Sequence, residues 1–295
     1  MILSGGRKVY QISINAVLLI VTLCMVLPMV LLFMSSITEE KSLIVNGYSF
    51  FPKKFSPAAY RYIITNSSSV FRAYGITIFA TALGTTATLL LTSLMAFPLS
   101  LRDLPGRNII SFFVFFTMLF NGGLVPSYIM WTTIFHIKNT VWAYIFPNFL
   151  LSAFNIILVR TYFQASIPVD IYNAAKIDGA GYLTIYWKVV LPLGKPILVT
   201  ISLFAGLTYW NDWTNGLYYI SDSRMLSIQA LLNRMIQDIQ ALLANSTADS
   251  GALMQIPQVS IRMAIAFVAV FPILIAYPFL QKYFESGIML GAVKG

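Results

Sequence analysis

The chain of 295 residues is 58% hydrophobic and only 10% charged, a composition outside the range of soluble globular domains. Its net charge is +9, but the basic residues are scattered and form no run of like charge, which argues against nucleic-acid binding. Cys24 is the only cysteine, so an intramolecular disulfide is excluded. We therefore expect an all-α membrane protein whose basic residues lie in loops near lipid head groups.

Long apolar stretches predict six transmembrane helices in one domain that covers residues 1–295. A helix needs about 20 mainly apolar residues to cross a bilayer. The first stretch is too long for a secretory signal, whose apolar region has roughly 7 to 15 residues. The predicted spans are residues 10–34, 73–100, 109–134, 140–159, 196–218 and 259–281.

The third predicted span is interrupted by Asn121-Gly122-Gly123 and then by Pro126. An irregular segment at membrane depth has to be buried in protein or line a cavity. Alternatively, the break is the outer end of a helix that turns into a loop. The sequence leaves both interpretations open.

The distribution of basic residues predicts the orientation of the chain. Arg7 and Lys8 precede the first span, and Arg102 and Arg107 lie in a short loop. Basic residues in short loops mark the cytoplasmic side. Six spans then place both termini in the cytoplasm and leave two long outer loops, 35–71 and 219–258.

The second outer loop contains apolar residues at helical spacing between Ile228 and Leu243. This periodicity predicts an amphipathic helix. Its apolar stripe either covers the ends of the spans or forms a docking surface for an external partner.

Residues 166–195 form a polar stretch between two apolar spans, with the pattern of a helix-turn-helix. Ser166 is a candidate N-cap for a first helix with Asp170 in its first turn. We expect that helix to end at Gly179 and a second helix, residues 182–190, to be stopped by Pro192.

Ile171, Ala174, Ala175 and Asp178 follow helical spacing on the first of these helices. They would share one face, and the alanines would let another body approach it closely. The stretch therefore has the features of a docking surface between membrane spans.

The sequence lacks the groups that would power or catalyse a reaction. No ionisable side chain lies deep in a predicted span, which counts against an ion-coupled carrier. There is no phosphate-binding Gly-x-x-x-x-Gly-Lys-Ser/Thr loop. His136 and Cys24 are single residues, so we expect neither a metal site nor a catalytic triad. Energy for transport would come from another subunit.

Aromatic and polar side chains meet near the end of the fifth span. Aromatic faces stack on sugar rings, while amides and carboxylates bind hydroxyl groups. An interfacial aromatic belt is the structural alternative. The candidate substrate-pathway residues are Asn121, Tyr209, Trp210, Asn211, Asp212 and Trp213.

The polar stretch resembles the cytoplasmic EAA loop of ATP-binding cassette importer permeases. The resemblance rests on Asn173-Ala174-Ala175, on Gly179, and on Val189-Val190-Leu191-Pro192 further along. Lys176-Ile177-Asp178-Gly179-Ala180 looks like the form found in carbohydrate-uptake permeases, the group that includes the second permease of the maltose importer.

Two further segments agree with this resemblance. The C-terminal Gly291-Ala292-Val293-Lys294-Gly295 is similar to the family tail. Residues 120–126 look like the subgroup associated with uptake of oligosaccharides and polysaccharide fragments. The resemblance covers nearly the whole chain.

The resemblance implies the type I importer permease fold, with residues 166–195 as a coupling-helix loop. The implied function is the transmembrane subunit of an ATP-driven carbohydrate importer, with an oligosaccharide as substrate. The chain would form half of the translocation pathway in a prokaryotic cell membrane, without catalytic activity or a cofactor of its own. The implied partners are a second permease in a heterodimer, two cytoplasmic ATPases that bind ATP and Mg, and an external solute-binding protein.

The resemblance also implies which residues contact the ATPase. The residues implied for the coupling loop are Asp170, Asn173, Ala174, Ala175, Asp178, Gly179, Ala180, Leu191 and Pro192. Lys294 and Gly295 are implied as a second contact.

One position departs from the family pattern. Asn173 stands where the motif usually begins with glutamate, and an amide cannot form the ion pair that a carboxylate would. Asp170, one helical turn earlier, is positioned to substitute.

Two other functions are compatible with the sequence. One is a self-contained channel or secondary carrier, which would need no ATPase. The other is a permease of the same family for a non-sugar solute. The Asp178-Gly179-Ala180 form and the aromatic cluster favour sugars by resemblance only, and they do not name the sugar.

Overall fold

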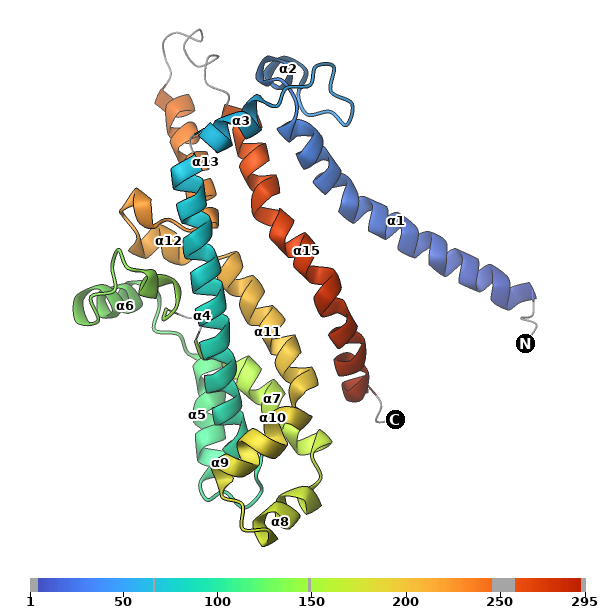
Figure 1. Cartoon of the computed structure of the whole chain (residues 1–295), viewed down its shortest axis with the longest axis vertical. Coiled ribbons are helices and arrows are strands. Elements are labelled where there is room, and N and C mark those ends of the chain that lie inside the picture. Colours follow the sequence, from blue (N-terminus) through green and yellow to red (C-terminus); the bar gives the residue numbers. More distant parts are fainter. Residues whose placement is uncertain (1–4, 66, 148–149, 246–257, 293–295) are drawn as a thin grey trace. The chain divides into compact units, whose positions relative to one another are not determined.

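The computed structural model describes residues 5–65, 67–147, 150–245 and 258–292 (Figure 1). Helices dominate this part of the chain, and its only β-structure is an isolated bridge between Thr38 and Phe55. The all-α class predicted from the composition is confirmed.

The chain divides into two compact units. Unit 1 comprises residues 1–70 and 234–272, and unit 2 comprises residues 71–233 and 273–295. Three helices continue from one unit into the other. They are α4 (Ser67–Ser100), α13 (Ile228–Asn245) and α15 (Gln258–Ala292).

Unit 1 begins with the long apolar helix α1 (Gly5–Ser36), followed by α2 (Glu40–Asn46) and α3 (Ala58–Thr65). The Glu40 carboxylate accepts hydrogen bonds from the backbone N–H groups of Val259 and Ser260, at 2.9 and 2.8 Å. A helix start has N–H groups without intrahelical partners, and a carboxylate suits both these groups and the helix dipole. Glu40 therefore caps α15, and much of the predicted outer loop 35–71 is helical.

Unit 2 is built around α4, α5 (Arg107–Leu119), α7 (Ala153–Ser166) and α11 (Lys195–Trp210). Helix α7 packs against both α5 and α11. The shorter elements of this unit are α6 (Leu124–Ile129), the π-helix η1 (Met130–Ile134), the 3-10 helix η2 (Val141–Tyr144), α8 (Val169–Ile177), α9 (Tyr182–Ile185), the π-helix η3 (Tyr186–Val190), α10 (Leu191–Leu193), α12 (Thr214–Tyr219) and the 3-10 helix η4 (Ser223–Met225).

Two helices in the described residues are long and apolar enough to cross a membrane, Tyr10–Ser36 and Ser68–Ser100. Two bent pairs raise the number to four if each pair counts as one span. They are Arg107–Leu119 with Leu124–Ile134, bent by 108°, and Tyr182–Leu193 with Lys195–Trp210, bent by 80°. The six-span arrangement stays a prediction.

The structure locates the break in the third predicted span. The Asn121 side chain accepts the backbone N–H of Gly123 at 2.8 Å, and Gly123 has a φ of +87°. A positive φ is accessible to glycine at little cost. This turn separates α5 from α6 and produces the sharp bend.

The fourth predicted span is wrong as one continuous helix. Residues 141–144 form a 3-10 turn, and α7 begins only at Ala153. Pro147 lies between them and has no N–H to continue a helical ladder. The fifth predicted span contains a break, because α11 stops at Trp210 and α12 starts at Thr214. The predicted amphipathic helix is confirmed as α13.

Helices α4 and α11 approach closely at Gly84. A Cβ atom added to Gly84 would lie 2.5 Å from ring carbons of Tyr209, which is only 3% exposed. Gly75, on the same helix, has open space around its Cα. The absence of a side chain at Gly84 thus makes room for the Tyr209 ring.

We expect Gly84→Ala to destabilise the protein by about 1–3 kcal/mol, because the added methyl group overpacks this contact. Gly75→Ala is the matched control and should be neutral or stabilising by about 0.5–1 kcal/mol, since alanine favours a helix. Thermal unfolding of the purified protein in detergent measures both. Equal unfolding temperatures for the two variants would contradict the close packing of α4 on α11.

Candidate functional site

The polar stretch between α7 and α11 begins with α8, a helix of nine residues. Asp170 lies in its first turn and Lys176 in its last, the arrangement that the helix dipole favours. The predicted cap by Ser166 is wrong. Ser166 is the last residue of α7, and the extended residues Ile167 and Pro168 separate it from α8.

The predicted helix end at Gly179 is confirmed. Gly179 has a φ of +79°, and its N–H donates to the carbonyl of Lys176 at 3.0 Å. The N–H of Ala180 donates to the carbonyl of Ala175 at 2.9 Å. These two bonds form a Schellman motif, which satisfies the last carbonyl groups of a helix and requires a left-handed residue.

Pro192 does not stop the second helix, contrary to prediction. The chain continues from α9 through the π-helix η3 into α10, which ends at Leu193. In η3 the ladder shifts by one residue, so that the N–H of Leu191 bonds to the carbonyl of Tyr186. The chain therefore passes Pro192 and bends by 80° before α11.

The bend at Gly194 depends on close contact with α7. A Cβ atom at Gly194 would lie 2.6 Å from the Phe163 ring and 2.9 Å from the carbonyl oxygen of Val190. Gly194 is buried and directly precedes α11. The sequence does not single out this glycine, because its role is a tertiary contact and not a local turn.

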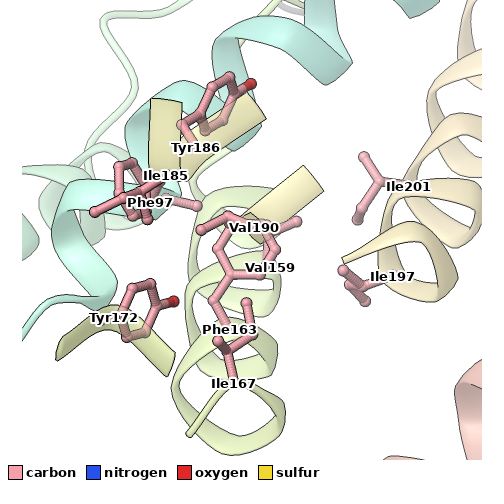
Figure 2. Packing of buried hydrophobic residues seen from close by; sticks show 11 residues of the cluster. Phe97, Val159, Phe163, Ile167, Tyr172, Ile185, Tyr186, Val190, Ile197 and Ile201 are labelled. Carbon is pink, nitrogen blue, oxygen red and sulfur yellow. The ribbon is translucent and has the colours of Figure 1, made fainter. Parts of the chain in front are cut away.

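One side of the loop is buried against the helices of unit 2, as Figure 2 shows. We call this packing the anchor cluster. Its buried members are Ala96, Phe97, Val159, Phe163, Ile167, Tyr172, Ile185, Tyr186, Val190, Ile197 and Ile201. They come from α4, α7, α8, α9, η3 and α11, except for Ile167, which lies in the link between α7 and α8.

Aromatic contacts and one hydrogen bond link the loop to α4. The Phe97 ring lies 5.8 Å from the Tyr186 ring and 6.4 Å from the Tyr172 ring. The Tyr186 and Ser93 hydroxyl oxygens are 2.7 Å apart, a buried hydrogen bond. These residues were not among the predicted site residues, although Tyr172, Ile185 and Val190 are apolar positions in a polar stretch.

The residues predicted to contact the ATPase divide between the two sides of the loop. Three of them, Ala175, Ala180 and Leu191, are partly buried and pack against the anchor cluster. Of the predicted shared face, Ile171, Ala174 and Asp178 are exposed, whereas Ala175 is half-buried. The exposed members of the predicted set are Asp170, Asn173, Ala174, Asp178, Gly179 and Pro192.

The exposed side of the loop also carries large apolar side chains. Ile177 is 86% exposed and Leu183 is 70% exposed. The Lys176 ammonium group lies 5.7 Å from the centre of the Tyr182 ring. Apolar side chains gathered with polar ones on an exposed surface are typical of a protein interaction site. We call this surface the outward face of the loop.

The other predicted contact with the ATPase, Lys294 and Gly295, lies outside the described residues. The second predicted site, residues 209–213, does not form one exposed cluster. Tyr209 and Asp212 are buried, whereas Asn211 and Trp213 are exposed and Trp210 is half-buried. Asn121 turns back on its own loop, and no described contact joins it to residues 209–213.

The buried pair has a structural role at the junction of α11 and α12. The Tyr209 hydroxyl donates to the carbonyl of Ile145 at 3.3 Å. One oxygen of Asp212 accepts the N–H of Asn215 at 3.0 Å, near the start of α12. The other oxygen of Asp212 has no hydrogen bond within the described part of the chain.

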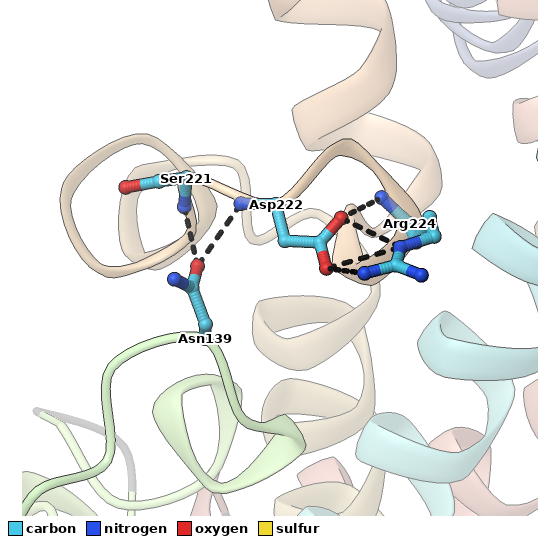
Figure 3. Close-up of polar contacts among 4 residues, drawn as sticks. All are labelled: Asn139, Ser221, Asp222 and Arg224. Carbon is cyan, nitrogen blue, oxygen red and sulfur yellow. Dashed lines mark hydrogen bonds and ion pairs between the residues drawn. The ribbon is translucent and has the colours of Figure 1, made fainter.

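A group of hydrogen bonds joins two loops of unit 2 (Figure 3). These contacts were not predicted from the sequence. Asn139 has a φ of +57°, and its side-chain oxygen accepts the N–H groups of Ser221 and Asp222 at 2.6 and 3.0 Å. Hydrogen bonds from the Arg224 guanidinium hold the pKa of Asp222 below its ordinary value. An asparagine that tolerates a left-handed backbone was the only local signal.

Comparison with known proteins identifies the class of this membrane protein. The family described as "Binding-protein-dependent transport system inner membrane component" matches residues 88–289, more than half of the chain. The chain belongs to this family. The matched residues include α8, Gly179 and the whole anchor cluster of this permease.

Its relatives cover almost the whole chain. The permease is 37% identical over 289 residues to the "Polygalacturonan/rhamnogalacturonan transport system permease protein YtcP" of Bacillus subtilis (strain 168), covering 98% of this chain and 99% of that one. It is 36% identical over 273 residues to "Protein LplC" of the same organism, covering 92% and 90%.

The fold is also found in a solved structure. The permease is similar to a chain in the crystal structure of a bacterial ABC transporter involved in the import of the acidic polysaccharide alginate. The TM-score is 0.79 at 29% identity, and the match covers 96% of this chain and 99% of that one. The predicted fold of an importer permease is confirmed.

The hydrogen bond between Ser93 and Tyr186 gives a testable link between the loop and α4. We expect Ser93→Ala and Tyr186→Phe each to destabilise the permease, and the double variant to lose about 1 kcal/mol less than the sum. Thermal unfolding of the four proteins in detergent completes this double-mutant cycle. Strictly additive losses would show that the two hydroxyl groups do not interact.

Proposed function

We propose that this permease is the transmembrane subunit of an ATP-driven importer of oligosaccharides and forms half of the translocation pathway. The names of two similar proteins support a carbohydrate substrate, because one relative is a polygalacturonan/rhamnogalacturonan permease and one solved neighbour imports alginate. The proposed location is a prokaryotic cell membrane with both termini in the cytoplasm. The proposed assembly contains a second, different permease, two ATPases and an external solute-binding protein.

The outward face of the loop is the proposed contact with an ATPase. It combines the exposed acids Asp170 and Asp178 with the apolar Ile177 next to the Gly179 turn. Asn173 is exposed three residues after Asp170, so the two side chains share one region of α8. Asp170 supplies the carboxylate that the amide of Asn173 cannot, while Lys294 and Gly295 form a second proposed contact.

The anchor cluster is the single observation that carries the coupling role. It joins the inner side of the loop to α4, α7 and α11 through buried side chains. Close-packed interiors transmit displacements because they have little free volume. A movement of the ATPase at the outward face would therefore shift the helices that bound the pathway. ATP and Mg would be bound and consumed on the ATPase, and this chain would hold neither.

A self-contained channel or carrier remains the alternative from another class. Reconstitution of this chain alone separates the two functions, because only a channel or carrier would move solute without ATPase subunits. If the permease instead carries a non-sugar solute, the ATPase activity of the assembled transporter would not respond to any oligosaccharide.

We expect Gly179→Pro to leave the permease inserted in the membrane and assembled with its partner permease but to abolish ATP-driven uptake. Proline fixes φ near −65° and has no N–H, whereas Gly179 has a φ of +79° and donates to Lys176. Gly181→Ala is the matched control, because Gly181 has a φ of −71° and open space around it. The measurement is uptake of labelled oligosaccharide by cells or proteoliposomes.

Gly181→Ala should keep uptake within about twofold of the unaltered permease, since alanine accepts this backbone conformation at little cost. Normal uptake by Gly179→Pro would contradict the coupling role of the loop. Copurification of ATPase subunits with the unaltered chain is the second requirement, and its failure would contradict the proposed function as a whole.

A further inference from the structure

A cavity of about 320 Å³ lies in unit 2 between α4, α7 and α11. Small-molecule sites range from about 300 to 1,000 Å³, so this cavity suits a short segment of a ligand. It is separate from the outward face of the loop and shares only Tyr209 with residues 209–213. Its position among three helices of the proposed pathway makes it a candidate binding site.

Among the described residues, the side chains that line the cavity are uncharged, and several of them can form hydrogen bonds. The polar ones carry hydroxyls and one amide, and all three helices or the residues next to them contribute. They belong to Thr88, Ser152, Asn155, Thr208 and Tyr209. Such groups donate and accept hydrogen bonds without a net charge, as sugar hydroxyls do.

Two of these residues have side-chain hydrogen-bonding groups that are available to a ligand. Ser152 precedes α7 but makes no capping hydrogen bond with its side chain. Within the described residues no hydrogen bond engages the half-buried amide of Asn155, which carries two donors and one acceptor. A partly buried amide normally finds partners, so these groups are consistent with a polar ligand or water in the cavity.

Two exposed aromatic rings complete the wall. Phe154 is 55% exposed and Phe204 is 43% exposed, and both line the cavity. Aromatic faces pack against the C–H faces of sugar rings, and the polar groups around them bind the hydroxyls. Aromatic faces and uncharged polar groups together favour a carbohydrate over an ion or a purely apolar ligand.

We propose that this cavity binds one neutral, hydroxyl-rich segment of the transported oligosaccharide, with Asn155 and Thr208 among its ligands. The inference rests on the proposed function as a sugar importer and adds where this chain contacts the sugar and through which groups. A sugar carboxylate would be desolvated here among uncharged groups, which costs free energy unless a cation compensates it. Any acidic group of the substrate would face another part of the pathway.

The test uses the complete transporter in proteoliposomes and two probes, galacturonic acid trisaccharide and its carboxyl-reduced counterpart. Asn155→Leu and Thr208→Val remove polar atoms with little change in volume. We expect each to raise the half-saturating concentration for uptake about 2- to 10-fold, the effect of one lost neutral hydrogen bond. The increase should be the same for both probes, because the carboxylates do not contact this cavity.

Thr161→Val is the matched control for Thr208→Val. Each threonine is exposed, and each donates its hydroxyl to the carbonyl four residues earlier at 2.8 Å, but Thr161 does not line the cavity. Its half-saturating concentration should be unchanged. If Asn155→Leu fails to insert, Thr208→Val carries the test.

Unchanged half-saturating concentrations in both cavity variants would overturn the proposed sugar site, while uptake by the unaltered transporter would still support the importer function. A loss confined to the acidic probe would overturn the neutral character of the site. Failure of the unaltered transporter to take up any oligosaccharide would count against the importer function itself.

Discussion

The permease depends on the packing of a polar loop onto apolar helices. Tyr172, Ile185 and Val190 turn inward from residues 166–195 and meet Phe97 of α4 and Phe163 of α7. Burial of each such side chain contributes about 1.5–3 kcal/mol, so the inner side of the loop is held firmly. Folding does not require the side chains of the outward face, so they can be suited to binding a partner. One loop thus combines a fixed side with a side open to docking.

Three glycines of unit 2 allow the backbone geometry on which this packing depends. Gly179 ends α8 with a left-handed residue and turns the chain, whereas Gly194 leaves room for Phe163 at the bend into α11. Gly84 does the same for Tyr209 further along α4. Two of the three glycines act through close approach and one through its own conformation. A substitution would therefore fail through steric overlap at Gly84 and Gly194 and through backbone strain at Gly179.

Local signals in the sequence predicted the helix end at Gly179, the amphipathic helix α13 and the all-α class. These features depend on one residue type or on a short periodic pattern. The split of the loop into two sides was not predictable, because Ala174 and Ala175 are identical in chemistry. Only the tertiary fold decides that Ala175 packs partly against the anchor cluster while Ala174 stays exposed. The helical chain continues past Pro192 because η3 is a π-helix. Residue propensities do not reveal such a shift of the backbone hydrogen-bond pattern. The resemblance supplied the partner, which no local signal names.

Docking of an ATPase on the outward face would cover Ile177, whose side chain is 86% exposed at the end of α8. Ile177→Cys and Val125→Cys, each made in a Cys24→Ser background, would be labelled with a maleimide with and without the ATPase subunits. Val125 on α6 is also exposed and serves as the control. The coupling account predicts that the ATPase slows labelling at position 177 at least about 10-fold and leaves position 125 unchanged, a difference of about 1.4 kcal/mol in accessibility. Equal labelling rates at position 177 in both conditions would contradict the account.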